Sequence, residues 1–249
     1  YAIPHMLTNS LRTIALARFA ALPRGEKRDK AIQDYMKPAM IPWSYHPVRK
    51  NMPLILNVPV GMYSDEPGQP WHQFEPQIIK SCPNYADDER RRQQRYYNIE
   101  KGRSLYDFCL DKKLSFIKHD IKAKLHISQN QSLVFWHNYL GKDENGLFLN
   151  FFDFRTNNGL EDEESRQFFF SIQKWLVIDQ SVDMDGIRPS ITRVDGSKKK
   201  GFKTVHYLSN GQGLYTPAEI AALVEEVLED WYRVEREIFG PERLTGTGN

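Results

Sequence analysis

The chain has 249 residues, of which 40% are hydrophobic and 12% aromatic, and its formal net charge is +2. This supply of large apolar side chains excludes a disordered protein and is enough to build a buried core. The nearly neutral charge excludes a polyanion-binding field over the whole molecule, so a nucleic-acid surface would have to come from local clusters of basic residues.

The cysteine content and the hydropathy pattern bear on the compartment. Cys82 and Cys109 are too few for a disulfide framework, and neither belongs to a Cys-x-x-Cys pair. Such usage is typical of a reducing compartment, and we therefore expect a cytoplasmic protein. No run of apolar residues reaches the length of a membrane span, so we expect no membrane partner.

The N-terminal part, residues 6–86, is predicted to be helical and rich in proline. Apolar residues recur at three- and four-residue steps over residues 9–22, and a second helix is expected over residues 26–36. Prolines then punctuate the chain, which favours ordered loop with one strand at residues 54–60. Trp43 and Trp71 lie in this region, and as exposed aromatic residues they would favour a protein partner.

Residues 87–240 form the predicted α+β body, followed by a loose tail at residues 241–249. A helix is expected from residue 87 to residue 110, with a break at Gly102. Residues 117–127 alternate between apolar and polar, which predicts a strand with one buried face. Residues 133–140 and 147–155 are predicted to form a central hairpin around an Asn-Gly turn, buried on both faces for much of its length.

The rest of the body contains two helices and a second hairpin. Residues 161–177 fit a helix better than a strand, because acids lead the segment and apolar residues follow at helical spacing. A hairpin is expected over residues 187–208. Thr216 and Glu219 form a capping box that starts the last helix, which Gly240 ends. The sequence therefore predicts an α+β fold, a mostly antiparallel sheet built from two hairpins and flanked by N- and C-terminal helices.

Asp120 and Lys122 raise the hypothesis of a metal-dependent nuclease. Two residues apart on a strand, they project to the same face, where the carboxylate would bind Mg²⁺ and the lysine would help to activate water. This is the only hypothesis that calls for a cofactor. The acids upstream, Asp107 and Asp111, fall in a predicted helix rather than on a neighbouring strand. The alternative is an exposed strand face with alternating charges.

Basic clusters are the second candidate site, because guanidinium and ammonium groups contact phosphates and tyrosines can stack on unpaired bases. The alternatives are local neutralisation of the arginines by Asp87, Asp88 and Glu89, and a lysine-rich turn that serves solubility. A third cluster is the lysine row of residues 118–124. The residues predicted to contact nucleic acid are Arg90, Arg91, Arg92, Arg95, Lys198, Lys199, Lys200 and Lys203.

Asp153 and Arg155 close an otherwise apolar strand. A charged pair in such a place is either an internal ion pair or the rim of a pocket, and we favour the ion pair because buried charges ordinarily need partners.

These observations rank three functions. Binding or processing of DNA or RNA comes first, because three separate basic clusters are present. A metal-dependent nuclease is the enzymatic version of this function. A protein–protein interaction module without catalysis is the alternative from a different class.

Overall fold

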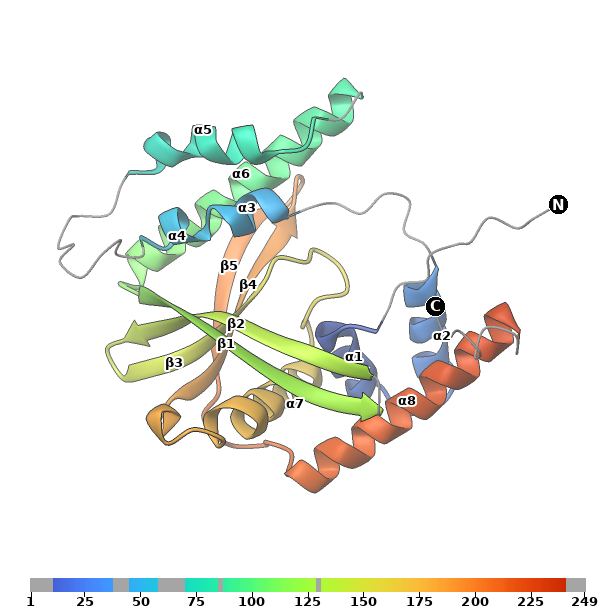
Figure 1. The fold of residues 1–249 in the computed structure, drawn as a ribbon. Helices are drawn as coiled ribbons and strands as arrows, with labels where there is room; N and C mark the ends of the chain where they lie inside the picture. Colours follow the sequence, from blue (N-terminus) through green and yellow to red (C-terminus); the bar gives the residue numbers. More distant parts are fainter. Residues whose placement is uncertain (1–10, 38–44, 58–69, 85–86, 129–130, 241–249) are drawn as a thin grey trace.

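The computed structural model describes residues 11–37, 45–57, 70–84, 87–128 and 131–240 (Figure 1). It is an α+β fold, as predicted, with helices on both sides of one sheet. The sheet has the order β1-β2-β3-β4-β5. β3 and β4 run parallel, and the other neighbouring pairs run antiparallel.

The strands and helices have the following bounds. The strands are β1 (Ser115–Ser128), β2 (Gln131–Asp143), β3 (Gly146–Asp153), β4 (Arg188–Ser197) and β5 (Gly201–Leu208). The helices are α1 (Thr13–Ala21), α2 (Glu26–Met36), α3 (His46–Lys50), α4 (Met52–Ile55), α5 (Trp71–Ser81), α6 (Asp88–Asp111), α7 (Glu163–Gln173) and α8 (Pro217–Phe239). A π-helical turn (Lys174–Ile178) and a 3₁₀ turn (Val182–Met184) follow α7.

Both predicted hairpins are present, and glycine geometry closes their turns. Gly146 opens β3 with a φ of 121°. Gly196 has a φ of 130°, and a Cβ there would meet the Gly201 carbonyl oxygen at 2.1 Å. Only glycine fits such a position, so the β4–β5 turn is specified by its glycines.

The described buried apolar residues form three clusters, of which the two largest lie on opposite faces of the sheet and the smallest lies beside the turns after α7. Helices α1, α2, α7 and α8 enclose the first core, to which Phe169 and Ile191 belong. Helices α3, α4, α5 and α6 enclose the other, which includes Val194. β2 contributes to both, since Phe135 belongs to the first core and Tyr139 to the second.

The proline-rich region differs from its prediction. It contains α3, α4 and α5, because Pro47 and Pro53 stand in the first turns of α3 and α4, where a missing N–H costs little. Leu54 lies in α4 rather than in a strand, and residues 58–60 of the predicted strand lie outside the described residues. Trp71 is buried in α5, which corrects its prediction as an exposed aromatic residue. Trp43 also lies outside the described residues.

Helix α6 runs unbroken through Gly102, contrary to the predicted break. A Cβ at Gly102 would lie 3.0 Å from Trp71 Cη2 and 3.3 Å from Ile78 Cδ1. Glycine is needed there because α5 packs closely against α6, so its role is in packing rather than in ending the helix.

The outer side of the β1–β2 hairpin is more exposed than its pattern predicts. The register of β1 shifts between Lys118 and Ile121, which interrupts the alternation and leaves Ile117 53% exposed. Val134 and Trp136 of β2 are also exposed, so the prediction that the central hairpin, formed by β2 and β3, is buried on both faces is wrong for the first half of β2.

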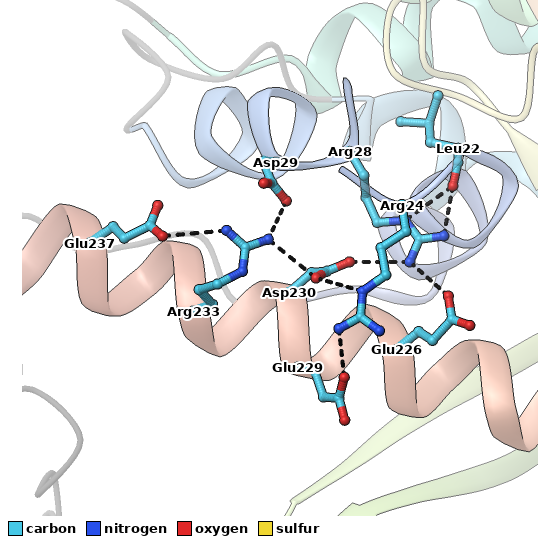
Figure 2. A network of polar contacts seen from close by, with 9 residues as sticks. All are labelled: Leu22, Arg24, Arg28, Asp29, Glu226, Glu229, Asp230, Arg233 and Glu237. Carbon is cyan, nitrogen blue, oxygen red and sulfur yellow. Dashed lines mark hydrogen bonds and ion pairs between the residues drawn. The ribbon is translucent and has the colours of Figure 1, made fainter. Parts of the chain in front are cut away.

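Asp230 joins the N-terminal helices to α8. Its side chain is 1% exposed and lies 3.2 Å from each of three arginines, Arg24, Arg28 and Arg233 (Figure 2). Arg28, 2% exposed, also donates to the Leu22 carbonyl oxygen. Such a carboxylate holds α2 and α8 together, because without it the buried guanidinium would lose its main counter-charge.

We expect Asp230→Ala to lower the free energy of unfolding by about 3–5 kcal/mol, because it leaves the buried Arg28 with only the partly exposed carboxylate of Glu226, at 3.3 Å, as a counter-charge. Glu229→Ala is the matched control. Its partner Arg24 and Glu229 itself are half-exposed, so solvent screens this pair and the loss should be much smaller. Urea unfolding of both variants measures the difference, and equal losses would contradict this role of Asp230.

Acid sensitivity is built into the core at His137. Its ring packs against Phe151 and Phe169, and burial lowers its pKa to about 4, partly offset by a hydrogen bond to the Asn150 carbonyl oxygen. The unfolded chain takes up this proton near pH 6.5 whereas the folded chain does not, so stability is lost as the pH falls from 6.5 towards 4.

We expect the free energy of unfolding to fall between pH 7 and pH 5, with His137 supplying about 2 kcal/mol of the loss. His137→Phe keeps an aromatic ring and removes the titrating group, so it should reduce the change in the free energy of unfolding between pH 7 and pH 5. His206, whose pKa burial also lowers to about 4, remains as a second source. Urea unfolding at both pH values measures the slope, and an unchanged slope in His137→Phe would refute the assignment.

Candidate protein-binding groove

The sheet opens where β2 and β3 part. β2 pairs with β3 only from Tyr139, opposite Asn150, to Asp143, opposite Gly146. Before Tyr139, β2 pairs with β1 along their long hairpin. After Asn150, β3 continues to Asp153 beside β4 (Figure 1). The two strands therefore diverge and leave a wedge between them.

A groove of about 720 Å³ occupies this wedge. Its walls come from the start of α1, from α3 and α4, from β2 before Tyr139 and from the end of β3 with the residues that follow it. A volume of this size is typical of sites for small ligands and for the anchoring side chains of a peptide. The lining residues that matter below are Arg12, Arg49, Trp136, Asn150 and Arg155.

The groove is electrostatically one-sided. Arg12, Arg49, Lys50 and Arg155 line it, and the described lining includes no aspartate or glutamate. Burial lowers the pKa of Arg155, with Asp153 raising it and Arg12 lowering it by repulsion. Asp153, whose charge raises the pKa of Arg155 and Arg49, is itself held by other groups, so these cations favour an anionic partner.

Asp153 is held by other groups. It accepts hydrogen bonds from the backbone N–H groups of Arg155 at 3.1 Å and Leu160 at 2.8 Å, and its carboxylate lies 3.7 Å from Arg193 Nε. The predicted ion pair between Asp153 and Arg155 is therefore wrong in its partner. The pocket-rim alternative describes Arg155, whose side chain lines the groove.

An apolar edge accompanies the charges. Trp136 is 50% exposed and Val134 is 46% exposed, both on β2 and both lining the groove. The Lys122 ammonium lies 4.8 Å from the centroid of the Trp136 ring. A half-exposed tryptophan beside a hollow is the kind of side chain that anchors protein interfaces.

Asn150 adds a buried donor. Its Oδ1 accepts hydrogen bonds from Ser190 Oγ at 2.9 Å and Thr192 Oγ1 at 2.8 Å, whereas its Nδ2 has no hydrogen-bond partner among the described residues. An unmade hydrogen bond at a buried donor costs free energy. Because Asn150 lines the groove, a bound acceptor would remove this cost.

The wall formed by β3 is held in place from behind by Lys101 of α6. Its buried ammonium donates to the carbonyl oxygens of Phe154 and Val194 and lies 4.4 Å from the centroid of the Tyr45 ring. Burial lowers the pKa of Lys101 to about 8. One side chain thus ties α6 to the end of β3, to β4 and to the residue before α3, so the groove has a fixed base.

A second hollow, of about 790 Å³, lies beside the turns that follow α7. Both cations of its lining are paired, since Lys174 lies 2.6 Å from Asp179 and Arg188 lies 2.6 Å from Asp143, and the lining also includes Asp185. It therefore lacks the unbalanced positive charge of the groove and is the weaker candidate.

The predicted basic clusters lie elsewhere. Arg90, Arg91, Arg92 and Arg95 are on α6, and Lys198, Lys199 and Lys200 form the exposed β4–β5 turn, with Lys203 on β5 opposite Asp195. The two clusters approach each other, because the rings of Tyr96 and Tyr97 pack on Phe202 with centroids 6.2 and 5.6 Å apart. These tyrosines are part of a packed contact rather than a free stacking platform.

Asp120 and Lys122 form no metal site with other residues that the structure describes. Both are exposed on β1, next to the register shift, and the Lys122 ammonium lies over Trp136. Within the described part of the chain, no three His, Cys, Asp or Glu side chains are grouped so that they could hold a metal ion.

The groove was not visible in the sequence, apart from Arg155. Arg12, Arg49 and Trp136 come from three separate segments, and none carries a motif. One signal in the sequence pointed to the exposed side of β2. Ser132, Val134 and Trp136 alternate with Leu133 and Phe135, so the two sets must lie on opposite faces of the strand.

These features define an α+β protein with a basic and apolar groove suited to a protein partner. The sequence matches the family described as the sliding clamp-binding bacterial toxin SocB over residues 14–238. Because this match covers most of the 249 residues, the chain belongs to that family. No curated protein matches the sequence significantly.

Family membership corrects the predicted function. The family is described by binding to a protein, the sliding clamp, so the predictions of nucleic-acid binding and of a nuclease are wrong. The basic clusters misled because local charge density does not distinguish a phosphate contact from a solvated helix or turn. The alternative of a protein-interaction module fits better. Of the described helices, none combines the length and the apolar character that crossing a membrane requires.

Proposed function

We propose that this protein binds a sliding clamp and that occupation of the clamp underlies a toxic effect on the bacterium that makes it. The observation that carries the proposal is the family match over residues 14–238. Binding alone suffices for such an effect, because a protein that occupies a surface of the clamp keeps other proteins from it. Since the clamp acts in DNA processing, we expect the chain to act in the cytoplasm.

We assign the contact with the clamp to the groove and to the exposed edge of β2 beside it. Trp136 and Val134 supply apolar area, and the arginines supply charge complementarity. Protein interfaces commonly concentrate their binding energy in a few aromatic and arginine side chains, and this is the part of the described surface where both kinds surround a hollow.

The test is the affinity of the purified chain for a purified sliding clamp from the same organism. Trp136→Ala should weaken binding about thirtyfold, because it removes a central aromatic anchor. Val182→Ala, at a residue that is 93% exposed in the 3₁₀ turn, is the matched control and should bind like the wild type. Biolayer interferometry with an immobilised clamp gives both affinities.

Two outcomes distinguish the proposed function, clamp binding, from the proposed location of the binding site at the groove. Absence of binding by the wild-type chain would overturn the function. Equal affinities of wild type and Trp136→Ala would overturn the site. Induced expression gives a second readout: the wild type should slow growth, and Trp136→Ala at the same protein level should not.

A further inference from the structure

The groove contains strand edges that lack strand partners. From Ser132 to Asn138, β2 pairs with β1 on one side, and no described strand pairs with it on the other. The edge of β3 from Phe151 to Asp153 that faces away from β4 is likewise without a strand partner among the described residues. Such edges present backbone N–H and C=O groups that can pair with an added strand.

The side chains around these edges specify what the added strand should carry. Arg12, Arg49 and Arg155 provide positive charge without a described acid in the lining, and Asn150 Nδ2 is a buried donor without a described partner. Carboxylates suit both features, because they can accept a hydrogen bond from the amide and balance the charge of the arginines. Trp136 and Val134 offer apolar contacts on the same edge.

We propose that the groove takes up an extended, carboxylate-bearing segment of the clamp, which pairs with the free edge of β2 as an added strand. Carboxylates of the segment would balance the arginines of the lining, and its apolar side chains would contact Trp136 and Val134. Backbone hydrogen bonds then supply affinity, and the arginines supply selectivity. The identity of the partner rests on the proposed function, whereas the chemistry of the segment follows from the groove.

The direct probe is a fluorescent peptide of about ten residues, long enough to cover the free edge of β2, in which glutamate alternates with valine and phenylalanine. A matched peptide carries lysine in place of each glutamate. The wild-type chain should bind the acidic peptide at least about tenfold more tightly than the basic one in fluorescence anisotropy. Equal binding of the two peptides, or no binding of either, would overturn the proposal.

Variants on exposed residues locate the peptide without threatening the fold. Arg12→Glu combined with Arg49→Glu should weaken binding of the acidic peptide at least about tenfold. Lys198→Glu combined with Lys199→Glu changes the net charge equally at the β4–β5 turn and should leave binding unchanged. Equal loss in both double variants would mean that only the overall charge matters, which would overturn the assignment to the groove.

Two further arms test strand pairing and the partner. Methylation of alternate backbone nitrogens on the edge-facing side of the acidic peptide removes its donors and should abolish binding, and undiminished binding would overturn strand addition. A sliding clamp should displace the peptide. A chain that binds the peptide but not the clamp would uphold the groove chemistry and refute the proposed function. A clamp that binds without displacing the peptide would refute this inference alone.

Discussion

The short pairing between β2 and β3 is the constraint on which the rest of the structure depends. Because it ends at Tyr139 and Asn150, β2 leaves the sheet with β1 and carries Phe135 into the core formed by α1, α2, α7 and α8. The same divergence leaves Tyr139 in the opposite core. A longer pairing would close the wedge, and with it the groove and the free edge of β2 would disappear.

The groove lowers the stability of the isolated chain, and the surrounding structure compensates for this loss of stability. Arginines that repel one another and a buried amide donor without a described partner are destabilising unless a ligand meets them. Lys101 fixes the wall formed by β3, and the Asp230 network joins α2 to α8. Rigid support around a destabilised surface is the arrangement expected of a binding site.

Local sequence signals predicted the elements better than they predicted the site. The capping box of α8, both hairpins and the acid-led α7 depend on neighbours in sequence, and they were predicted correctly. Gly102 and Trp71 were misread because a contact between two helices decides their roles. The groove could not be predicted, because Arg12, Arg49 and Trp136 meet only through the fold. The lysine turn at residues 198–200 drew attention because its charge is contiguous, a local property that says little about the partner.

The central claim is that the free edge of β2 is where this protein meets the sliding clamp. Hydrogen exchange of the backbone amides, followed by mass spectrometry with and without the purified clamp, tests it most directly. The account predicts that the clamp slows exchange in β2 between Ser132 and Asn138 and at the end of β3, and leaves the β4–β5 turn unchanged. Protection confined to that turn or to α6, with β2 exchanging as in the free protein, would contradict it.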